Sequence, residues 1–225
     1  MLKKSIGVIV AHPDDEVLGF CGTMLKEIDL GNKVYVLFLS TGLSSRENNT
    51  DKKDILSLRQ TALEVSKKIG VTQTIFEEFP DNNMDSVPLL SVVKKVEKFL
   101  IEFKINEIYT HYINDLNIDH QITAKAVLTA ARPLPKNNVS KILSGEVLSS
   151  SEYTEFNQRF TPNVFVNIEK YIDKKVDILR LYKNELRDWP HPRSLQAVKN
   201  LAEMRGSEIG IKGAEAFLLL RDIIK

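Results

Sequence analysis

Residues 6–29 read IGVIVAHPDDEVLGFCGTMLKEID, and within one turn their pattern changes from that of a strand to that of a helix. Residues 6–10 are apolar and mostly β-branched, which indicates a buried strand. Between Asp15 and Asp29 the apolar residues recur at the spacing of an amphipathic helix, and Gly31 suits the end of that helix. A strand that leads directly into a helix predicts one unit of a parallel sheet flanked by helices.

The same alternation of strands and helices continues through the first half of the chain. Further strands are expected at 34–39, 74–79 and 107–111, and further helices at 55–69, 88–104 and 119–131. Later elements are less regular, with strands expected at 141–148 and 163–168, a helix at 169–186 and a last helical stretch after Pro192. The polar residues 43–53 are expected to form a loop. No repeat or linker divides the chain, so we expect a single α/β domain over residues 1–225, with a C-terminal helical region.

The composition excludes several classes of protein. The chain has 225 residues, with 31 Lys plus Arg against 30 Asp plus Glu and a formal charge of +1. This balance argues against a polybasic protein that binds nucleic acid or a membrane surface. No apolar stretch approaches the roughly 20 residues that span a bilayer. The apolar run near the N-terminus is too short for the core of a signal peptide, so we expect a cytoplasmic location.

One cysteine and four histidines limit the kinds of metal site that the chain could build. Cys21 alone cannot form an internal disulfide or a cysteine-based zinc site, and we expect it to be a buried thiol. Any metal centre must therefore combine carboxylates with some of the histidines, which are His12, His111, His120 and His191.

The loop after the first strand has unusual chemistry. Residues 11–16 read AHPDDE, so a histidine and three carboxylates stand where a dinucleotide-binding protein has glycines. Carboxylates would repel a pyrophosphate, and a cation is their natural partner. His12 and Asp15 lie across a tight turn and can reach one metal ion, which leaves Asp14 beside it as an unligated base. Carboxylates also cap helices, so a structural role for Asp15 and Glu16 is the alternative.

A second loop adds ligands at the same edge of the predicted sheet. Residues 110–120 read THYINDLNIDH and contribute two more histidines and two carboxylates. His120, at the start of a helix, is the candidate third ligand, which gives a His, Asp, His set with an open position for water. A metal ion in such a site would acidify bound water toward neutrality. Helix capping is the alternative for Asp119, and His111 is equally compatible with supporting a ligand and with packing.

These motifs resemble those of the PIG-L, or LmbE-like, N-acetylglucosaminyl deacetylases. The shared features are AHPDDE after an N-terminal strand, Thr41-Gly42 after the second strand, and Asp119-His120 at the opening of a helix in mid-chain. The resemblance covers the whole chain with compatible spacing. It implies a Rossmann-like, mostly parallel α/β fold and the zinc-dependent removal of an acetyl group from an N-acetylated amino sugar.

The resemblance also implies a role for each residue of the two loops. His12, Asp15 and His120 would be the metal ligands, and Asp14 would be the general base. Zinc is the expected metal, although two histidines and one carboxylate also suit Fe(II). Asp14 would take a proton from the attacking water and pass it to the departing amine, without a covalent intermediate.

The chain departs from this family at Asn117. Many members have a histidine at this position, which is thought to stabilise the oxyanion or to act as an acid. An asparagine can donate a neutral hydrogen bond but cannot transfer a proton, so only the oxyanion role remains open to Asn117. His191 lies in the proline-flanked turn at 189–194 and is our candidate for the missing acid; a surface turn that ends a helix is the alternative.

Three more residues are expected to contact the substrate. Arg59 lies on the second helix, where the family often has an arginine, Asp81 follows a strand, and Arg193 suits pairing with an anionic group. The expected substrate is a small N-acetylated sugar or sugar conjugate of glycoconjugate biosynthesis. The alternatives are a non-sugar acylamine as substrate and a non-catalytic module that binds metal or sugar. Neither a nucleic-acid partner nor a transmembrane segment is expected, and a homo-oligomer is left open.

Overall fold

The computed structural model describes residues 3–40, 42, 52–134 and 137–224. Most of the loop expected at 43–53 and Thr41 of the second motif lie outside this part of the chain. The strands are β1 (Ser5–Val10), β2 (Lys33–Ser40), β3 (Gln73–Phe79), β4 (Glu107–His111), β5 (Lys141–Gly145), β6 (Val164–Asn167) and β7 (Ala214–Asp222). The α-helices are α1 (Asp15–Asp29), α2 (Lys52–Ile69), α3 (Leu89–Glu102), α4 (Ile118–Ala130), α5 (Ile172–Leu179) and α6 (Leu195–Ser207).

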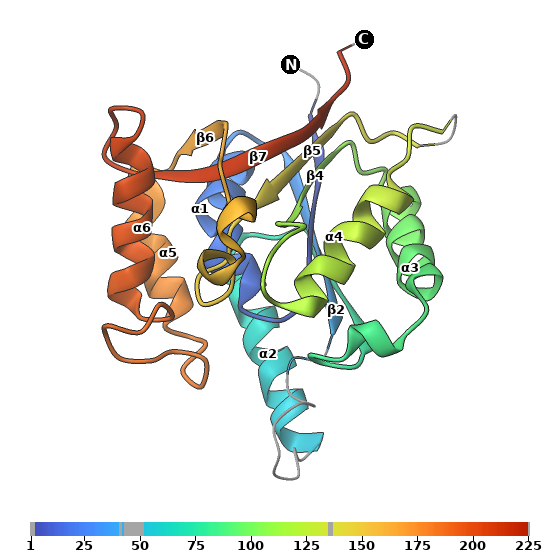
Figure 1. Cartoon of the computed structure of the whole chain (residues 1–225), viewed down its shortest axis with the longest axis horizontal. Coiled ribbons are helices and arrows are strands. Elements are labelled where there is room, and N and C mark those ends of the chain that lie inside the picture. The colour runs from blue at the N-terminus through green and yellow to red at the C-terminus, as the bar shows by residue number, and fades with distance from the viewer. Residues whose placement is uncertain (1–2, 41, 43–51, 135–136, 225) are drawn as a thin grey trace.

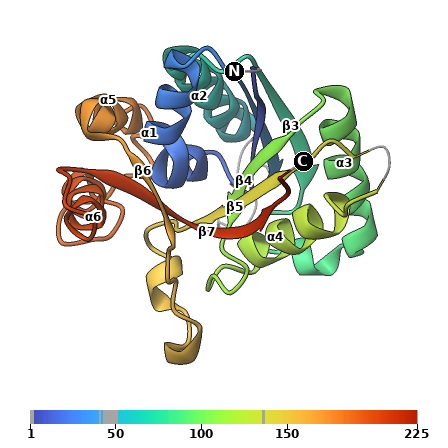
Figure 2. The same cartoon turned by 90° about the horizontal axis from the view of Figure 1, so that it is seen from above.

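The strands form one mostly parallel sheet in the order β3-β2-β1-β4-β5-β7-β6. Strands β1 to β5 pair in parallel, and β7 runs antiparallel to both β5 and β6. Helices α1, α2, α5 and α6 cover one face of the sheet, and α3 and α4 cover the other (Figures 1 and 2). The expected α/β fold with a mostly parallel sheet flanked by helices is confirmed.

The strand order reverses direction at the carboxyl ends of β1 and β4. The chain winds outward from β1 to β3 and then returns to the other side of β1 with β4. At such a reversal the loops that follow the two central strands diverge, and ligands of open α/β sheets bind between them. The loops that carry AHPDDE and Asp119-His120 follow these two strands.

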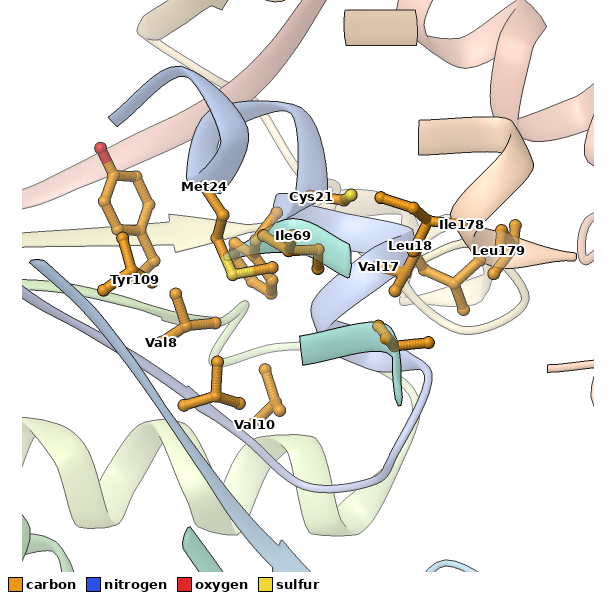
Figure 3. Packing of buried hydrophobic residues seen from close by; sticks show 14 of the residues in the cluster. Val8, Val10, Val17, Leu18, Cys21, Met24, Ile69, Tyr109, Ile178 and Leu179 are labelled. Carbon is orange, nitrogen blue, oxygen red and sulfur yellow. The ribbon is translucent and has the colours of Figure 1, made fainter. Parts of the chain in front are cut away.

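The core forms two layers because alternate residues of each strand point to opposite faces. Val8 and Val10 of β1 pack with Cys21 of α1 and with apolar residues of α2 and α5 (Figure 3). Ile9, between them, packs on the other face with residues of α3 and α4. One layer reaches Val10 and the other Ile9, so the end of β1 is packed on both faces where the AHPDDE loop begins. Cys21 is fully buried, as expected.

The C-terminal region differs in detail from the pattern expected from the sequence. The helix expected at 169–186 is the short α5, followed by turns, and the expected helix after Pro192 is α6. Strand β7 was not expected. Residues 214–222 read AEAFLLLRD and are rich in helix-forming alanine and leucine, but pairing with β5 and β6 overrides that local preference. Among the helices of the described ranges, none is both long and apolar enough to cross a membrane.

A buried ion pair fastens this C-terminal region to α1. Lys175 Nζ lies 2.7 Å from Glu215 Oε1 and also donates to the carbonyl of Leu18 at 2.8 Å. The Glu215 carboxylate accepts from the backbone N–H groups of Gly22 at 2.8 Å and Thr23 at 2.7 Å. Both charged side chains are about 5% exposed, so each depends on the other for its compensation.

We predict that Glu215→Ala lowers the free energy of unfolding by about 3–5 kcal/mol, because it leaves the Lys175 ammonium buried without its counter-charge. Urea denaturation followed by circular dichroism measures the change. Glu169→Ala is the matched control, since it removes the exposed partner of Lys212 and should change stability by no more than about 0.5 kcal/mol. A Glu215→Ala protein as stable as the wild type would show that the ion pair of Lys175 and Glu215 does not stabilise the fold.

Candidate metal centre and general base

The loops after β1 and β4 bring together the three residues predicted to be metal ligands. Asp15 Oδ2 lies 3.3 Å from His12 Nδ1 and 3.3 Å from His120 Nε2. One ligand atom from each of the three side chains lies within 4.8 Å of the others. His12 comes from the turn after β1, Asp15 opens α1, and His120 stands in the first turn of α4.

Two further carboxylates set the orientation of the imidazoles. His12 Nε2 lies 3.0 Å from Asp119 Oδ2, and the Asp119 carboxylate also accepts two backbone N–H groups from the segment that follows β3. An ionised carboxylate only accepts, so Nε2 of His12 keeps its proton for Asp119, and Nδ1, which faces Asp15, is the nitrogen that would give up its proton to a metal ion. His120 Nδ1 lies 3.2 Å from Asp115 Oδ1, which leaves its Nε2 facing Asp15. Each ring therefore turns toward the same point the nitrogen that would lose its proton to a metal ion.

Two buried atoms of this cluster lack a hydrogen-bond partner among the described residues. They are Asp15 Oδ1 and His120 Nε2. A buried polar atom without a partner costs on the order of 1–3 kcal/mol, so both atoms call for one. A divalent cation accepts lone pairs from a carboxylate and from neutral imidazoles at once, and the His, Asp, His set is one that zinc and Fe(II) both use. The residues thus fit a metal ion.

The charges of the cluster favour a cation as well. Burial opposes the charged form of His12, but its hydrogen bonds to Asp119 and Asp15 raise its pKa to about 10. Burial opposes the charged form of His120 too, and Asp15 and Asp115 raise its pKa to about 9. The carboxylates thus make this point attractive to positive charge, and a metal ion must displace protons to bind there.

His111 supports the cluster, and its Nε2 lies 3.4 Å from Asp15 Oδ2. Its ring stacks on that of His120, with centroids 3.8 Å apart and an angle of 9° between the planes. Its Nε2 accepts the backbone N–H of Ala11 at 2.8 Å. Burial lowers the pKa of His111 to about 4, and the neighbouring His120 adds to the effect. His111 is therefore a neutral, packed residue that also holds the turn after β1, which combines the two readings left open by the sequence.

Asp14 stands beside the cluster in an unusual backbone conformation. Its φ is 121° and its ψ is −30°, in a region that costs a residue with a side chain about 1–3 kcal/mol. The side chain is buried, and its Oδ2 lies 3.2 Å from Arg193 Nη1. Burial raises the pKa of Asp14 to about 7, and the Arg193 guanidinium opposes that rise. A carboxylate with such a pKa can accept and return a proton near neutral pH.

The turn at 189–194 brings Arg193, not His191, to Asp14. The His191 side chain is exposed, and its Nδ1 accepts the backbone N–H of Arg193 at 3.0 Å. Its ring therefore closes its own turn, and the structure does not bring it to the His12, Asp15 and His120 cluster. The expectation that His191 takes the place of the missing histidine has no support in this geometry.

Asn117 is the N-cap of α4. Its Oδ1 accepts from the backbone N–H groups of Asp119 at 2.8 Å and His120 at 3.4 Å, and its Nδ2 donates to Asn82 Oδ1 at 3.0 Å. The asparagine thus takes the capping role that the sequence left open for Asp119, and Asp119 is free to hold His12. At α1 the N-cap position belongs to Asp14, whose side chain makes no capping hydrogen bond.

The two remaining predicted contacts lie in different surroundings. Asp81 is buried with Oδ1 3.2 Å from His12 Nε2, so it lies beside a cluster residue. The Arg59 guanidinium pairs with Glu78 at 3.0 Å and lies over the ring of Phe76 at 5.4 Å from its centroid. Arg59 is on α2 and Glu78 on β3, and neither of these contacts involves the cluster.

Three residues near the cluster were not singled out from the sequence. Asp115 was counted only as one of the carboxylates of its loop, although its position five residues before His120 was a usable signal. Tyr182 and Glu185 follow α5 and contact Glu16 and Arg193 respectively. Nothing in their local sequence indicates a contact so far along the chain.

Comparison with known proteins identifies a family that shares the part of the chain with this site. Residues 7–131 match the family model described as PIG-L: GlcNAc-PI de-N-acetylase. The uncharacterized deacetylase YaiS of Escherichia coli (strain K12) is 27% identical over 188 residues, which cover 81% of this chain and 92% of YaiS.

Solved structures share the fold over nearly the whole chain. The N,N'-diacetylchitobiose deacetylase from Pyrococcus horikoshii superposes with a TM-score of 0.80 at 20% identity, over 97% of this chain and 84% of its own. GalB, the 4-carboxy-2-hydroxymuconate hydratase from Pseudomonas putida KT2440, gives 0.78 at 15% identity, over 100% and 98%. The family model spans more than half of the chain and includes both loops of the cluster, and the chain therefore belongs to the PIG-L family.

Proposed function

We propose that the protein is a metal-dependent N-deacetylase that hydrolyses the acetamido group of an amino sugar or sugar conjugate and releases acetate and the free amine. The observation that carries this proposal is the pairing of a His, Asp, His cluster with a separate buried carboxylate, Asp14, directly beside it. The family description and the substrate named for the Pyrococcus enzyme support an N-acetylated sugar. A non-sugar acylamine is the alternative substrate.

His12, Asp15 and His120 would hold the metal ion, with Nδ1 of His12 and Nε2 of His120 as the nitrogen ligands. Zinc is the metal we propose, and Fe(II) is the alternative for the same donors. When bound, such an ion acidifies water and polarises the amide carbonyl. Asp119 and Asp115 would keep the two rings turned toward it, because each accepts a hydrogen bond on the far side of its imidazole.

Asp14 would act first as base and then as acid. The Arg193 guanidinium favours the ionised carboxylate, so Asp14 can accept a proton from the attacking water. Amide hydrolysis then needs a proton on the departing nitrogen. Asn117 cannot transfer one, and the Nδ1 of His191 is used within its own turn, so the protonated Asp14 returns it.

The substrate contacts change accordingly. We propose that Arg193 acts on Asp14 and that Asp81 acts on His12, because those are the side chains they contact. Arg59 remains the proposed contact for a sugar hydroxyl or an anionic group, since exchange of the exposed Glu78 for a ligand would cost little. Asn117 Nδ2 remains a neutral donor at the start of α4.

We predict that Asp14→Asn lowers kcat by at least about 100-fold and leaves bound metal unchanged, because the amide cannot take up a proton. Acetate release from a panel of N-acetyl sugars and N-acetyl amines measures turnover and identifies the substrate class. Asp173→Asn is the matched control, since its side chain is 93% exposed on α5. Undiminished turnover of Asp14→Asn with metal in place would refute the assignment of the base.

We also predict that metal binding is coupled to protons. A chelator should abolish acetate release, and Zn²⁺ or Fe²⁺ should restore it. Because His12 and His120 have raised pKa values, their rings are protonated at neutral pH and must lose protons to bind, so metal affinity should fall as pH falls. Calorimetry in buffers of different ionisation enthalpy detects the released protons. A metal affinity that is the same at pH 6 and pH 8 would contradict this cluster as the site.

A third prediction concerns His191. Because its side chain is exposed and bonded to its own turn, His191→Ala should leave kcat within a factor of about 3 of the wild type. Arg193→Ala, in the same turn, is the comparison and should lower kcat more. A loss of two orders of magnitude on His191→Ala alone would assign the proton donor to His191 after all.

A further inference from the structure

The strained backbone of Asp14 requires contacts that fix its conformation. Its φ of 121° is one that residues with side chains rarely adopt, and such conformations persist only where the surroundings fix them. The carbonyl of Asp14 accepts the N–H groups of Val17 and Leu18, both at 3.0 Å, as α1 begins. These bonds belong to the start of a helix and fix only one side of the residue. The other side depends on the N–H of Asp14.

The backbone N–H of Asp14 donates to the side chain of Glu16, at its Oε2, over 2.9 Å. Glu16 is fully buried in the first turn of α1, and its other oxygen, Oε1, accepts from the hydroxyl of Tyr182 at 2.6 Å. Tyr182 is itself 1% exposed, in the turn after α5. A packed tyrosine ring has little freedom, so its hydroxyl fixes where the Glu16 carboxyl group lies.

We propose that Tyr182, through Glu16, positions the general base. The hydroxyl of Tyr182 fixes the Glu16 carboxyl group, and that group holds the N–H of Asp14, so the strained backbone aims the Asp14 carboxylate beside the cluster. Tyr182 and Glu16 would act through Asp14 and not on the reacting atoms, so both are positioning residues. The inference deepens the proposed function and rests on it for the role of Asp14.

The same stretch of chain holds the carboxylate end of Asp14. Arg193 Nη1 lies 3.2 Å from Asp14 Oδ2 and 3.4 Å from Glu185 Oε2. Glu185 also donates its backbone N–H to the carbonyl of Tyr182 at 2.9 Å. Arg193, which holds the Asp14 carboxylate, and Tyr182, which holds Glu16, both lie beyond the part matched by the family model, which ends at residue 131. The later part of the chain supplies no member of the His, Asp, His cluster, but it contributes to holding Asp14 at both its carboxylate and, through Glu16, its backbone N–H.

The first test removes one hydroxyl group. Tyr182→Phe keeps the ring in the core, and we expect kcat to fall at least about tenfold while KM changes by less than about twofold, because a misplaced base slows chemistry more than binding. Tyr171→Phe is the matched control, since it removes a tyrosine bond to the Asp29 carboxylate at the surface. A role confined to stability would lower the melting temperature of Tyr182→Phe and leave kcat unchanged well below that temperature.

The conservative variant at Glu16 gives the second test. In Glu16→Gln the amide oxygen still accepts the N–H of Asp14, and the amide nitrogen can donate to the Tyr182 hydroxyl oxygen. We expect Glu16→Gln to retain most of the kcat that Glu16→Ala loses. Equal losses in the two variants would show that the hydrogen bond to Asp14 is not what matters.

A double variant tests whether Tyr182 acts through Asp14. Once Asp14→Asn has removed the base, Tyr182→Phe should cause no further loss, because there is no base left to position. If the two losses instead multiply, Tyr182 acts independently of Asp14 and the inference fails.

Amide hydrogen exchange tests the inference without an activity measurement. In Tyr182→Phe the N–H of Asp14 should exchange at least about tenfold faster, while that of Val17 in the same turn should change less. Tyr171→Phe should alter neither. An unchanged rate at Asp14 would overturn the inference even if the enzyme is active. Failure of the wild type to release acetate from every substrate would instead refute the proposed function, and the exchange rates would still decide the role of Tyr182.

Discussion

One carboxylate oxygen, Asp15 Oδ2, holds together the loops that follow β1 and β4. It accepts the backbone N–H of His12 at 2.8 Å and lies 3.3 to 3.4 Å from imidazole nitrogens of His12, His111 and His120. Burial opposes a charge here, yet the His120 imidazole and the hydrogen bond to His12 bring the pKa of Asp15 well below its usual range. Because β1 and β4 are adjacent, a single anion at the start of α1 can organise side chains from segments about a hundred residues apart.

The sequence predicted the first half of the fold well because there each element carries its own signal. The apolar run at 6–10 and the helical spacing at 15–29 correspond closely to β1 and α1. The later part depends on distant partners. Residues 214–222 form β7 only because β5 and β6 offer edges on either side, and a run of alanine and leucine cannot show that locally.

The residues of the site divide in the same way into those that the local sequence predicts and those that depend on distant partners. His12, Asp14 and Asp15 lie in one motif, so their closeness follows from the chain itself, and His120 follows from the parallel strands that carry the two loops. The contact of Tyr182 with Glu16 joins positions 166 residues apart and leaves no local pattern. The prolines identified a stiff turn at 189–194, but which side chain of that turn faces Asp14 depends on how α5 and α6 pack.

The fold by itself does not decide the reaction, since a hydratase shares it over the full chain at a TM-score of 0.78. The observation that favours one type of reaction is Asp14, a carboxylate that lies outside the His12, Asp15 and His120 cluster. Asp14 stays separate from the donors because its backbone turns it aside and Arg193 holds it there. A relative that kept the loops at 11–16 and 110–120 but changed Tyr182 and Arg193 would keep the proposed donor set and lose these contacts to the proposed base. The proposed donors and base thus lie in the two loops, but Arg193 and Tyr182, which help to hold Asp14, come from the later part of the chain, so that part could alter the base without altering the donors.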